Sequence, residues 1–192
     1  MLKPLLPNVW QWSWFSPEKQ LDFNGLLLTV GEHRILVDPP ALSPEDKTQL
    51  RRMGGIDYVV ITNRDHVREA KEHRREFGCQ LYTPALDAPQ MDITPTHTYK
   101  DGELLPGGIW AVHLTGQKSP GECALYLQQS PGVMIVGDAL IGKPPGSVSM
   151  LPADKFEDPV SAKEGLRRLL KYSFEVLLVG DGVSIMSGAK AT

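Results

Sequence analysis

Three short apolar strands in this sequence each run into an aspartate, and this repeated arrangement is the strongest constraint on the fold. The three segments end at Asp65, Asp138 and Asp181, and Asp65 is followed directly by His66. Strands of four or five apolar residues are usually buried on both faces, so they belong inside a covered sheet. Because their ends open at a sheet edge, we expect the three carboxylates and the imidazole to share one cleft. Such donors suit a hard or borderline metal cation.

The length and composition are those of an ordinary globular domain. The chain has 192 residues, 41% hydrophobic and 22% charged, which is enough for a single domain over residues 1–192. A net charge of −3 gives no electrostatic reason to expect a nucleic-acid partner. No apolar run is long enough to span a bilayer, and Pro4 and Pro7 make the N-terminus a poor signal peptide. The two cysteines, Cys79 and Cys123, are expected to be buried at or in strands. They could form one disulfide, but so few cysteines favour a reducing compartment, the cytoplasm.

The apolar patterns and turn residues predict a series of short strands and three helices. The strands are expected at residues 26–30, 34–37, 57–62, 79–83, 97–100, 108–115, 122–128, 132–137 and 175–179. The helices are expected from Pro44 to the Gly54-Gly55 pair, over 65–77 and over about 160–171. Residues 1–22 are expected to be irregular and to pack against the sheets, although the alternating tryptophans at 10–14 would also suit an edge strand.

The helix ends carry recognisable signals. Ser43 is expected to cap the first helix, and Gly78 to end the second in a left-handed conformation. The second helix would place Arg68 on a charged, solvated face. Ser161 and Glu164 fit a capping box at the start of the third helix.

The order of the elements predicts the fold class. An early hairpin and a run of successive strands disfavour a purely parallel, doubly wound sheet. Two mixed sheets packed face to face, with helices outside, suit the order better.

The ordered set of segments resembles the metallo-β-lactamase fold superfamily, which includes glyoxalase II-like hydrolases. The matching parts run from about Asn24 to Met186: Leu36-Val37-Asp38-Pro39, Thr62-Asn63-Arg64-Asp65-His66, the Gly116–Gly121 turn, Gly137-Asp138, and Gly180-Asp181-Gly182. The resemblance implies an α/β (α+β) fold, a four-layer αββα sandwich of two mixed β-sheets. It also implies a metal site in which this chain departs from the family pattern.

Half of the family's metal site is missing in this sequence. Aligned on Asp65-His66, the family motif H-x-H-x-D-H places its first two histidines at Ile61 and Asn63. A third family histidine is replaced by Gln117 or Lys118, in a turn that is one residue longer. These replaced ligand positions are expected to line the cleft. Isoleucine cannot ligate a metal, and an amide oxygen is a weak donor, so this half of the site is lost.

The other half keeps most of its ligands. The resemblance assigns metal-ligand positions to Asp65, His66 and Asp138, and Asp181 stands where the family has its last histidine. Close carboxylates cannot all stay ionised without a compensating cation. Three arrangements remain open: one divalent ion (Zn²⁺, Mn²⁺, Fe²⁺ or Mg²⁺), the Lys118 ammonium in place of a metal, or a partly protonated, metal-free cleft.

Two functions follow from these alternatives. The first is a metal-dependent hydrolase with at most one metal, in which Asp65 acts as base and the resemblance suggests a small ester or thioester substrate. The second is a non-catalytic protein that uses the same fold for binding or as a scaffold, without a metal. The chain ends soon after its last strand, which would leave an apolar surface, so a homodimer is a further expectation.

Overall fold

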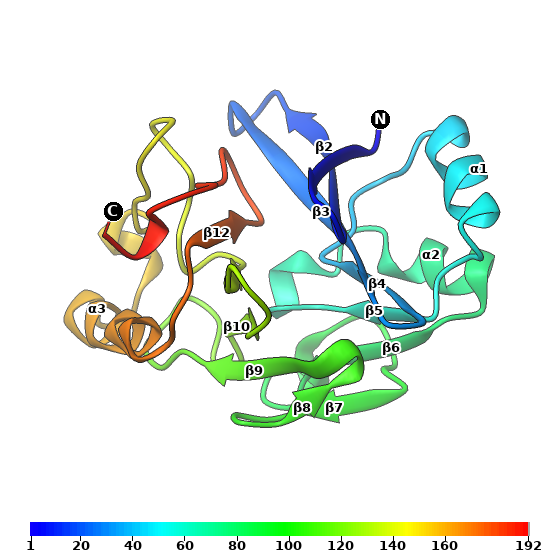
Figure 1. The fold of residues 1–192 in the computed structure, drawn as a ribbon. Coiled ribbons are helices and arrows are strands. Elements are labelled where there is room, and N and C mark those ends of the chain that lie inside the picture. Colours follow the sequence, from blue (N-terminus) through cyan, green and yellow to red (C-terminus); the bar gives the residue numbers. More distant parts are fainter. Residues whose placement is uncertain (192) are drawn as a thin grey trace.

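Two β-sheets packed face to face form the centre of the molecule, and helices cover both outer sides (Figure 1). The computed structural model describes residues 1–191. The first sheet contains, in spatial order, β1 (Lys3–Leu6), β2 (Val9–Ser16), β3 (Leu21–Val30), β4 (His33–Val37), β5 (Tyr58–Val60), β6 (Gln80–Pro84) and β7 (His97–Tyr99). The second contains β12 (Val176–Val179), β11 (Val133–Val136), β10 (Cys123–Leu127), β9 (Ile109–His113) and β8 (Leu104–Leu105).

Both sheets are mixed, as the sequence predicts. The strands from β1 to β4 pair in an antiparallel manner, whereas β4 to β7 are parallel. In the second sheet β11 and β12 are parallel and the remaining pairs are antiparallel. The sequence-based prediction of two facing mixed sheets with outer helices is therefore confirmed.

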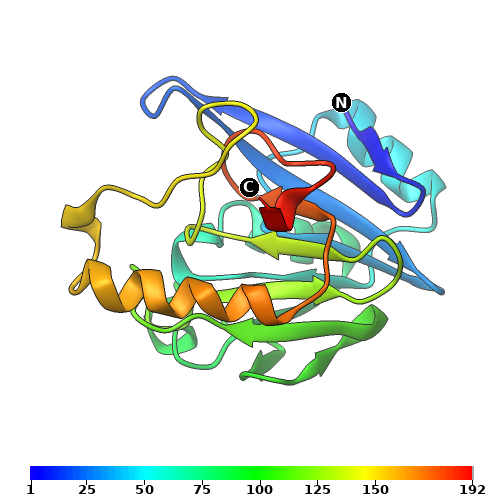
Figure 2. The ribbon, with the colours of Figure 1, turned by 60° about the vertical axis from the view of Figure 1, so that its left-hand side comes forward.

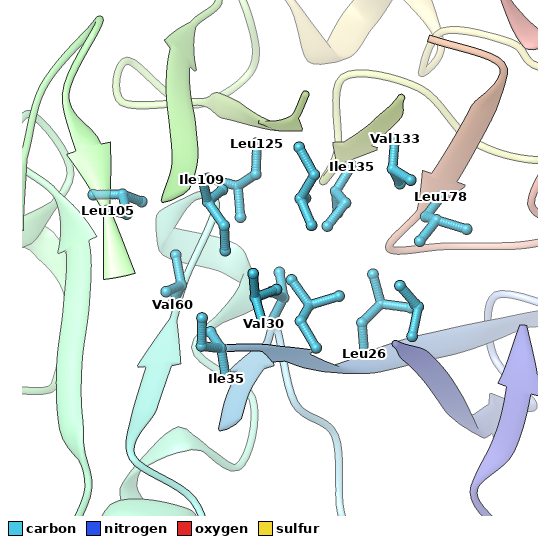
Figure 3. Packing of buried hydrophobic residues seen from close by; sticks show 14 of the residues in the cluster. Leu26, Val30, Ile35, Val60, Leu105, Ile109, Leu125, Val133, Ile135 and Leu178 are labelled. Atoms are coloured by element: carbon cyan, nitrogen blue, oxygen red, sulfur yellow. The ribbon is translucent and has the colours of Figure 1, made fainter. Parts of the chain in front are cut away.

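The main core lies between the two sheets. Leu26, Val30 and Ile35 of the first sheet face Leu125 and Ile135 of the second, as Figure 3 shows. Residues two apart along a strand share a face, so alternate residues of these strands enter this layer. Burial of both strand faces explains why the strands are almost continuously apolar.

The outer faces of the sheets are covered by helices. Helices α1 (Pro44–Arg52) and α2 (Ala70–Phe77) cover the first sheet, where Leu50 and Ala70 pack on strand residues such as Leu36. Helix α3 (Pro159–Arg167) and the 3-10 turn that continues it cover the second sheet (Figure 2), where Leu169 packs on Met134. No helix within residues 1–191 is long and apolar enough to cross a membrane.

Several local predictions are confirmed. The Ser43 side chain caps α1 by accepting a hydrogen bond from the Asp46 amide, and Gly78 ends α2 at φ +66°. Cys79 and Cys123 are both buried and free.

Other local predictions are wrong. Residues 1–22 are not irregular: they form β1, β2 and the start of β3, because the alternating tryptophans pair in register with β3. The expected helix at 65–77 is broken into the 3-10 turn Arg64–His66 and α2, since Arg68 adopts φ +43° between them. Asp158, not the Ser161–Glu164 pair, caps α3 by accepting a hydrogen bond from the Val160 amide.

Candidate functional site

A pocket of about 580 Å³ opens where strands of both sheets end. The parallel pairs β4–β5 and β11–β12 end at this edge, and the residues after them are Asp38, Asp65, Asp138 and Asp181. The pocket is lined by Lys19, Leu21, Phe23, Asp65, His66, Arg68, Lys118, Asp138, Ile141, Leu151, Pro152, Lys155 and Asp181. All four residues predicted as metal ligands therefore line one pocket, which has a charged floor and a partly apolar wall.

His66 lies buried between two aspartates. Its Nδ1 is 2.8 Å from Asp38 Oδ2, and its Nε2 is 3.3 Å from Asp138 Oδ1. Burial and the charge of Arg68 lower the pKa of His66, but the two carboxylates outweigh them and raise it to about 10. A side chain at Gly180 would meet the imidazole ring, since a Cβ there would lie 2.6 Å from Cε1, so glycine is required at this position.

Asp38 holds His66 from behind. Its carboxylate accepts hydrogen bonds from the Thr62 amide (2.8 Å) and the Thr62 hydroxyl (2.5 Å) as well as facing His66. Asp38 has φ +46°, a conformation that costs energy for a residue with a side chain and that is frequent at functional sites. The fixed carboxylate determines the orientation of the imidazole ring.

Lys118 enters the pocket and bridges two of the aspartates. Its Nζ lies 2.9 Å from Asp65 Oδ2 and 2.9 Å from Asp138 Oδ2. Partial burial lowers the pKa of Lys118, but the two carboxylates prevail and raise it above its ordinary value. Burial alone would raise the pKa of Asp138; contacts with His66 and Lys118 hold it well below its usual range.

Arg68 is a second cation on the floor of the pocket. Its Nη2 donates to Asp181 Oδ1 at 2.6 Å and lies 3.5 Å from His66 Nε2. The guanidinium also donates to the backbone carbonyls of Asn24, Asp38 and Gly180, and it lies 5.0 Å over the Phe23 ring. The predicted place of Arg68 on a solvated helix face is therefore wrong: its side chain is only 10% exposed.

The other replaced ligand positions do not line the pocket. Ile61 is fully buried among the apolar residues beneath α1 and α2. Asn63 is buried below the floor, where its Oδ1 accepts a hydrogen bond from the Asp65 amide. Gln117 turns away because its Nε2 donates to the Ala162 carbonyl of α3 at 2.8 Å. Of the two residues considered for the third histidine position, Lys118 is the one that reaches the pocket.

Two further buried acids support the site and were not identified from the sequence. Asp87 accepts hydrogen bonds from the Arg64 amide (2.8 Å), the Gly121 amide (2.7 Å) and the Ser119 hydroxyl, and so ties the turn that carries Lys118 to the first sheet. Glu122 is fully buried, and burial raises its pKa well above the usual range. Neither residue follows a readable motif, whereas Asp38 did carry a signal: it also comes directly after an apolar strand.

One group of donor atoms lies close enough together to share a metal ion. His66, Asp138 and Asp181 are the only three such residues within 1–191 whose ligand atoms all lie within 4.8 Å of one another. These atoms already face cations, because Arg68 contacts Asp181 and Lys118 contacts Asp138. A divalent ion would meet the positive charges of Lys118 and Arg68 at close range. The residues present therefore do not fit a resident metal while Lys118 and Arg68 stay in place.

The comparison with protein families identifies the family. A model of the metallo-beta-lactamase superfamily matches residues 2–192. This chain belongs to that superfamily. The search of curated proteins found no match.

Solved structures share the superfamily fold at low sequence identity. A metallo-beta-lactamase from Pontibacter korlensis has a TM-score of 0.78 and 16% identity, covering 100% of this chain and 95% of the other. The protein TTHA1623, solved in a di-iron-bound form, has a TM-score of 0.72 and 22% identity, covering 91% and 94%. A metallo-beta-lactamase with a HARLDQ motif from Cronobacter sakazakii has a TM-score of 0.69 and 15% identity, covering 94% and 80%. These structures confirm the predicted fold. At such low identity they do not show which chemistry this chain performs, so the chemistry is argued from its own site residues.

Proposed function

We propose that this superfamily member binds a small molecule in the pocket and uses Lys118 and Arg68, in place of a resident metal ion, as the positive charges of the site. The single observation that carries the proposal is the position of Lys118 Nζ, 2.9 Å from a carboxylate oxygen of Asp65 and 2.9 Å from one of Asp138. Neighbouring carboxylates need a compensating cation, and the chain supplies it.

The side chains that could act as bases in hydrolysis are already paired with other groups of the protein, which favours binding over hydrolysis. Both ring nitrogens of His66 face carboxylates, so neither is free to take a proton from water. Asp65, the predicted catalytic base, holds the Lys118 ammonium. Lys118 has three N–H donors and uses two of them on aspartates, so one remains for a ligand. The apolar wall, which includes Phe23 and Leu151, suits a compact molecule with an apolar body and a polar end.

Elemental analysis tests this proposal. The protein is produced without a histidine tag, after growth with added manganese, iron and zinc, and its metal content is measured by mass spectrometry. We expect less than about a tenth of an ion per chain, because metal binding must displace Lys118. A panel of ester and thioester substrates is then assayed with the wild type and with Asp65→Ala. Turnover that Asp65→Ala abolishes, or a stoichiometric metal, would contradict the proposal.

A second candidate is favoured by one specific observation. The donor atoms of His66, Asp138 and Asp181 are grouped within 4.8 Å, and TTHA1623, a structural relative, was solved with two irons. A single zinc, manganese or iron ion there, together with Asp65, would make the chain a metal-dependent hydrolase of small esters or thioesters. The same elemental analysis distinguishes this candidate from the metal-free one.

The predictions on surroundings and assembly stay open to test. A single domain, a cytoplasmic location, a homodimer and the absence of nucleic-acid or membrane partners are expectations from the sequence. Light scattering at micromolar concentration measures the oligomeric state directly.

A further inference from the structure

A second cavity opens at the edge where β6, β7 and β9 end, on the other side of the turn that carries Lys118. Its volume is about 240 Å³, and no residue within 1–191 lines both this cavity and the Lys118 pocket. We infer that this cavity is a binding site for a neutral aromatic molecule of about the size of phenol or indole that carries one hydrogen-bond donor. The inference does not depend on what the Lys118 pocket binds.

The floor of the cavity belongs to the apolar core between the two sheets. Tyr99 and Cys123 line the floor, and they are only 1% and 2% exposed. The Tyr99 hydroxyl donates to the Ile61 carbonyl at 2.6 Å, and burial raises the pKa of the Cys123 thiol, so neither side chain offers a charge. Pro84 and Leu86 add further apolar surface. Such a lining disfavours a charged ligand and favours an aromatic body.

The volume of the cavity suits one small ring system. An apolar cavity of about 150 Å³ is enough to bind benzene. The cavity of about 240 Å³ therefore has room for a ring with one substituent or for two fused rings, and it is smaller than the pockets of about 300–1,000 Å³ that hold drug-sized ligands. Leu86 is 59% exposed, so the cavity is open to solvent on this side and a ligand can enter the folded protein.

His113 supplies the polar group that recognises the donor of the ligand. Its Nε2 lies 2.8 Å from the Pro120 carbonyl oxygen, which can only accept, so Nε2 donates and Nδ1 is the acceptor of the neutral imidazole. Nδ1 has no partner among residues 1–191. The Asp101 carboxylate also lines the cavity, but it already accepts from the His113 amide at 3.0 Å and from Arg168 at 2.7 Å. We therefore assign His113 Nδ1 as the acceptor for an O–H or N–H group.

Fluorine NMR titrations with three matched ligands test the chemical class. The ligands 4-fluorophenol, fluorobenzene and 4-fluorobenzoate share a ring and carry a hydroxyl donor, no polar group and a carboxylate. We expect 4-fluorophenol to bind with a Kd of about 1 mM or below. It should bind about threefold or more tightly than fluorobenzene, because without an acceptor the cavity would favour the less hydrated ligand. Binding of 4-fluorobenzoate should be about tenfold or more weaker than that of 4-fluorophenol, since its charge loses water.

A pair of matched variants tests the location. Ala85 lines the cavity, whereas Ala88 lies three residues further along the same loop and outside the cavity, and both are half-buried. Ala85→Leu fills part of the space, so we expect it to bind 4-fluorophenol about tenfold or more weakly than the wild type. Ala88→Leu should bind within about twofold of the wild type.

The imidazole resonances give a second measurement, which decides the location if Ala85→Leu does not fold. In the wild type, 4-fluorophenol should shift the Nδ1 resonance of His113 and leave that of His33 unchanged, because His33 is exposed at the start of β4 and lies outside the cavity. An unmoved His113 resonance overturns the inference, and so does equal affinity of Ala85→Leu and Ala88→Leu. Tighter binding of fluorobenzene or 4-fluorobenzoate than of 4-fluorophenol overturns it as well, because the acceptor would then play no part or the exposed Lys100 would bind an anion.

Discussion

The pocket has two halves, and in each half a cation of the chain compensates the negative charge of neighbouring carboxylates. In the Lys118 half, one partly exposed ammonium bridges Asp65 and Asp138. In the Arg68 half, one buried guanidinium pairs with Asp181. Each half places a cation beside strand-end carboxylates, yet the two cations differ in how many other contacts hold them.

The difference indicates which charge is structural and which can be exchanged. Arg68 also donates to carbonyls of Asn24, Asp38 and Gly180, so it links the first sheet to the turn after β12. Lys118 contacts its two carboxylates from a turn. A planar guanidinium with several fixed donors suits a permanent cross-link, whereas an ammonium on a flexible stem suits a group that a ligand or ion can displace.

The largest expected effect on stability comes from removing the Arg68 guanidinium. Arg68→Met leaves the buried Asp181 carboxylate without its guanidinium partner and removes one hydrogen bond from each of three backbone carbonyls, so we expect a loss of about 3–5 kcal/mol in the free energy of unfolding. Urea denaturation measures the change. Arg75→Met is the control, because Arg75 is 79% exposed and pairs with Glu72 on the surface of α2. A loss no greater than that of the control would mean that Arg68 is not a cross-link.

A smaller effect is expected from Asp87, which holds the Lys118 turn in place. Asp87→Asn keeps the shape of the side chain but replaces one acceptor oxygen by an amide, so one of the Arg64, Ser119 and Gly121 donors loses its partner. We expect a loss of about 1–3 kcal/mol in the free energy of unfolding. The Lys118 resonance should also shift in NMR spectra of the variant. An unchanged Lys118 environment would show that the turn is positioned by other contacts.

Much of the fold could be predicted because its signals are local. Apolar runs and turn residues located most of the strands, and Ser43 and Gly78 marked helix ends through contacts within a few residues. For residues 1–22 the sequence favoured an irregular segment and left a strand at 10–14 as an alternative, because Trp10–Trp14 becomes a strand only by pairing with β3. Trp12 is buried in this pairing and Trp14 is about half exposed, an alternation that local sequence leaves ambiguous.

The site could be predicted in part, for the same reason. Strand-end aspartates meet because parallel strands share an edge, and the sequence reveals where strands end. The choice between Gln117 and Lys118 is not local: the Ala162 carbonyl, far along the chain, binds Gln117 and leaves Lys118 to enter the pocket. Arg68 reaches Asp181 from a backbone conformation with positive φ, and no sequence motif predicts that conformation.

The smallest expected effect comes from removing Lys118 itself, and it completes the comparison of the two halves. Asp138 keeps its contact with His66, and Asp65 is 40% exposed to water, so Lys118→Met leaves neither carboxylate without stabilisation. We expect a loss of about 1 kcal/mol in the free energy of unfolding, measured in metal-free buffer. Lys47→Met, which removes a similarly exposed, ion-paired ammonium, should cost a similar amount. A loss as large as that of Arg68→Met would show that Lys118 is a structural cation, because a charge that can be exchanged for a ligand cannot also be essential for folding.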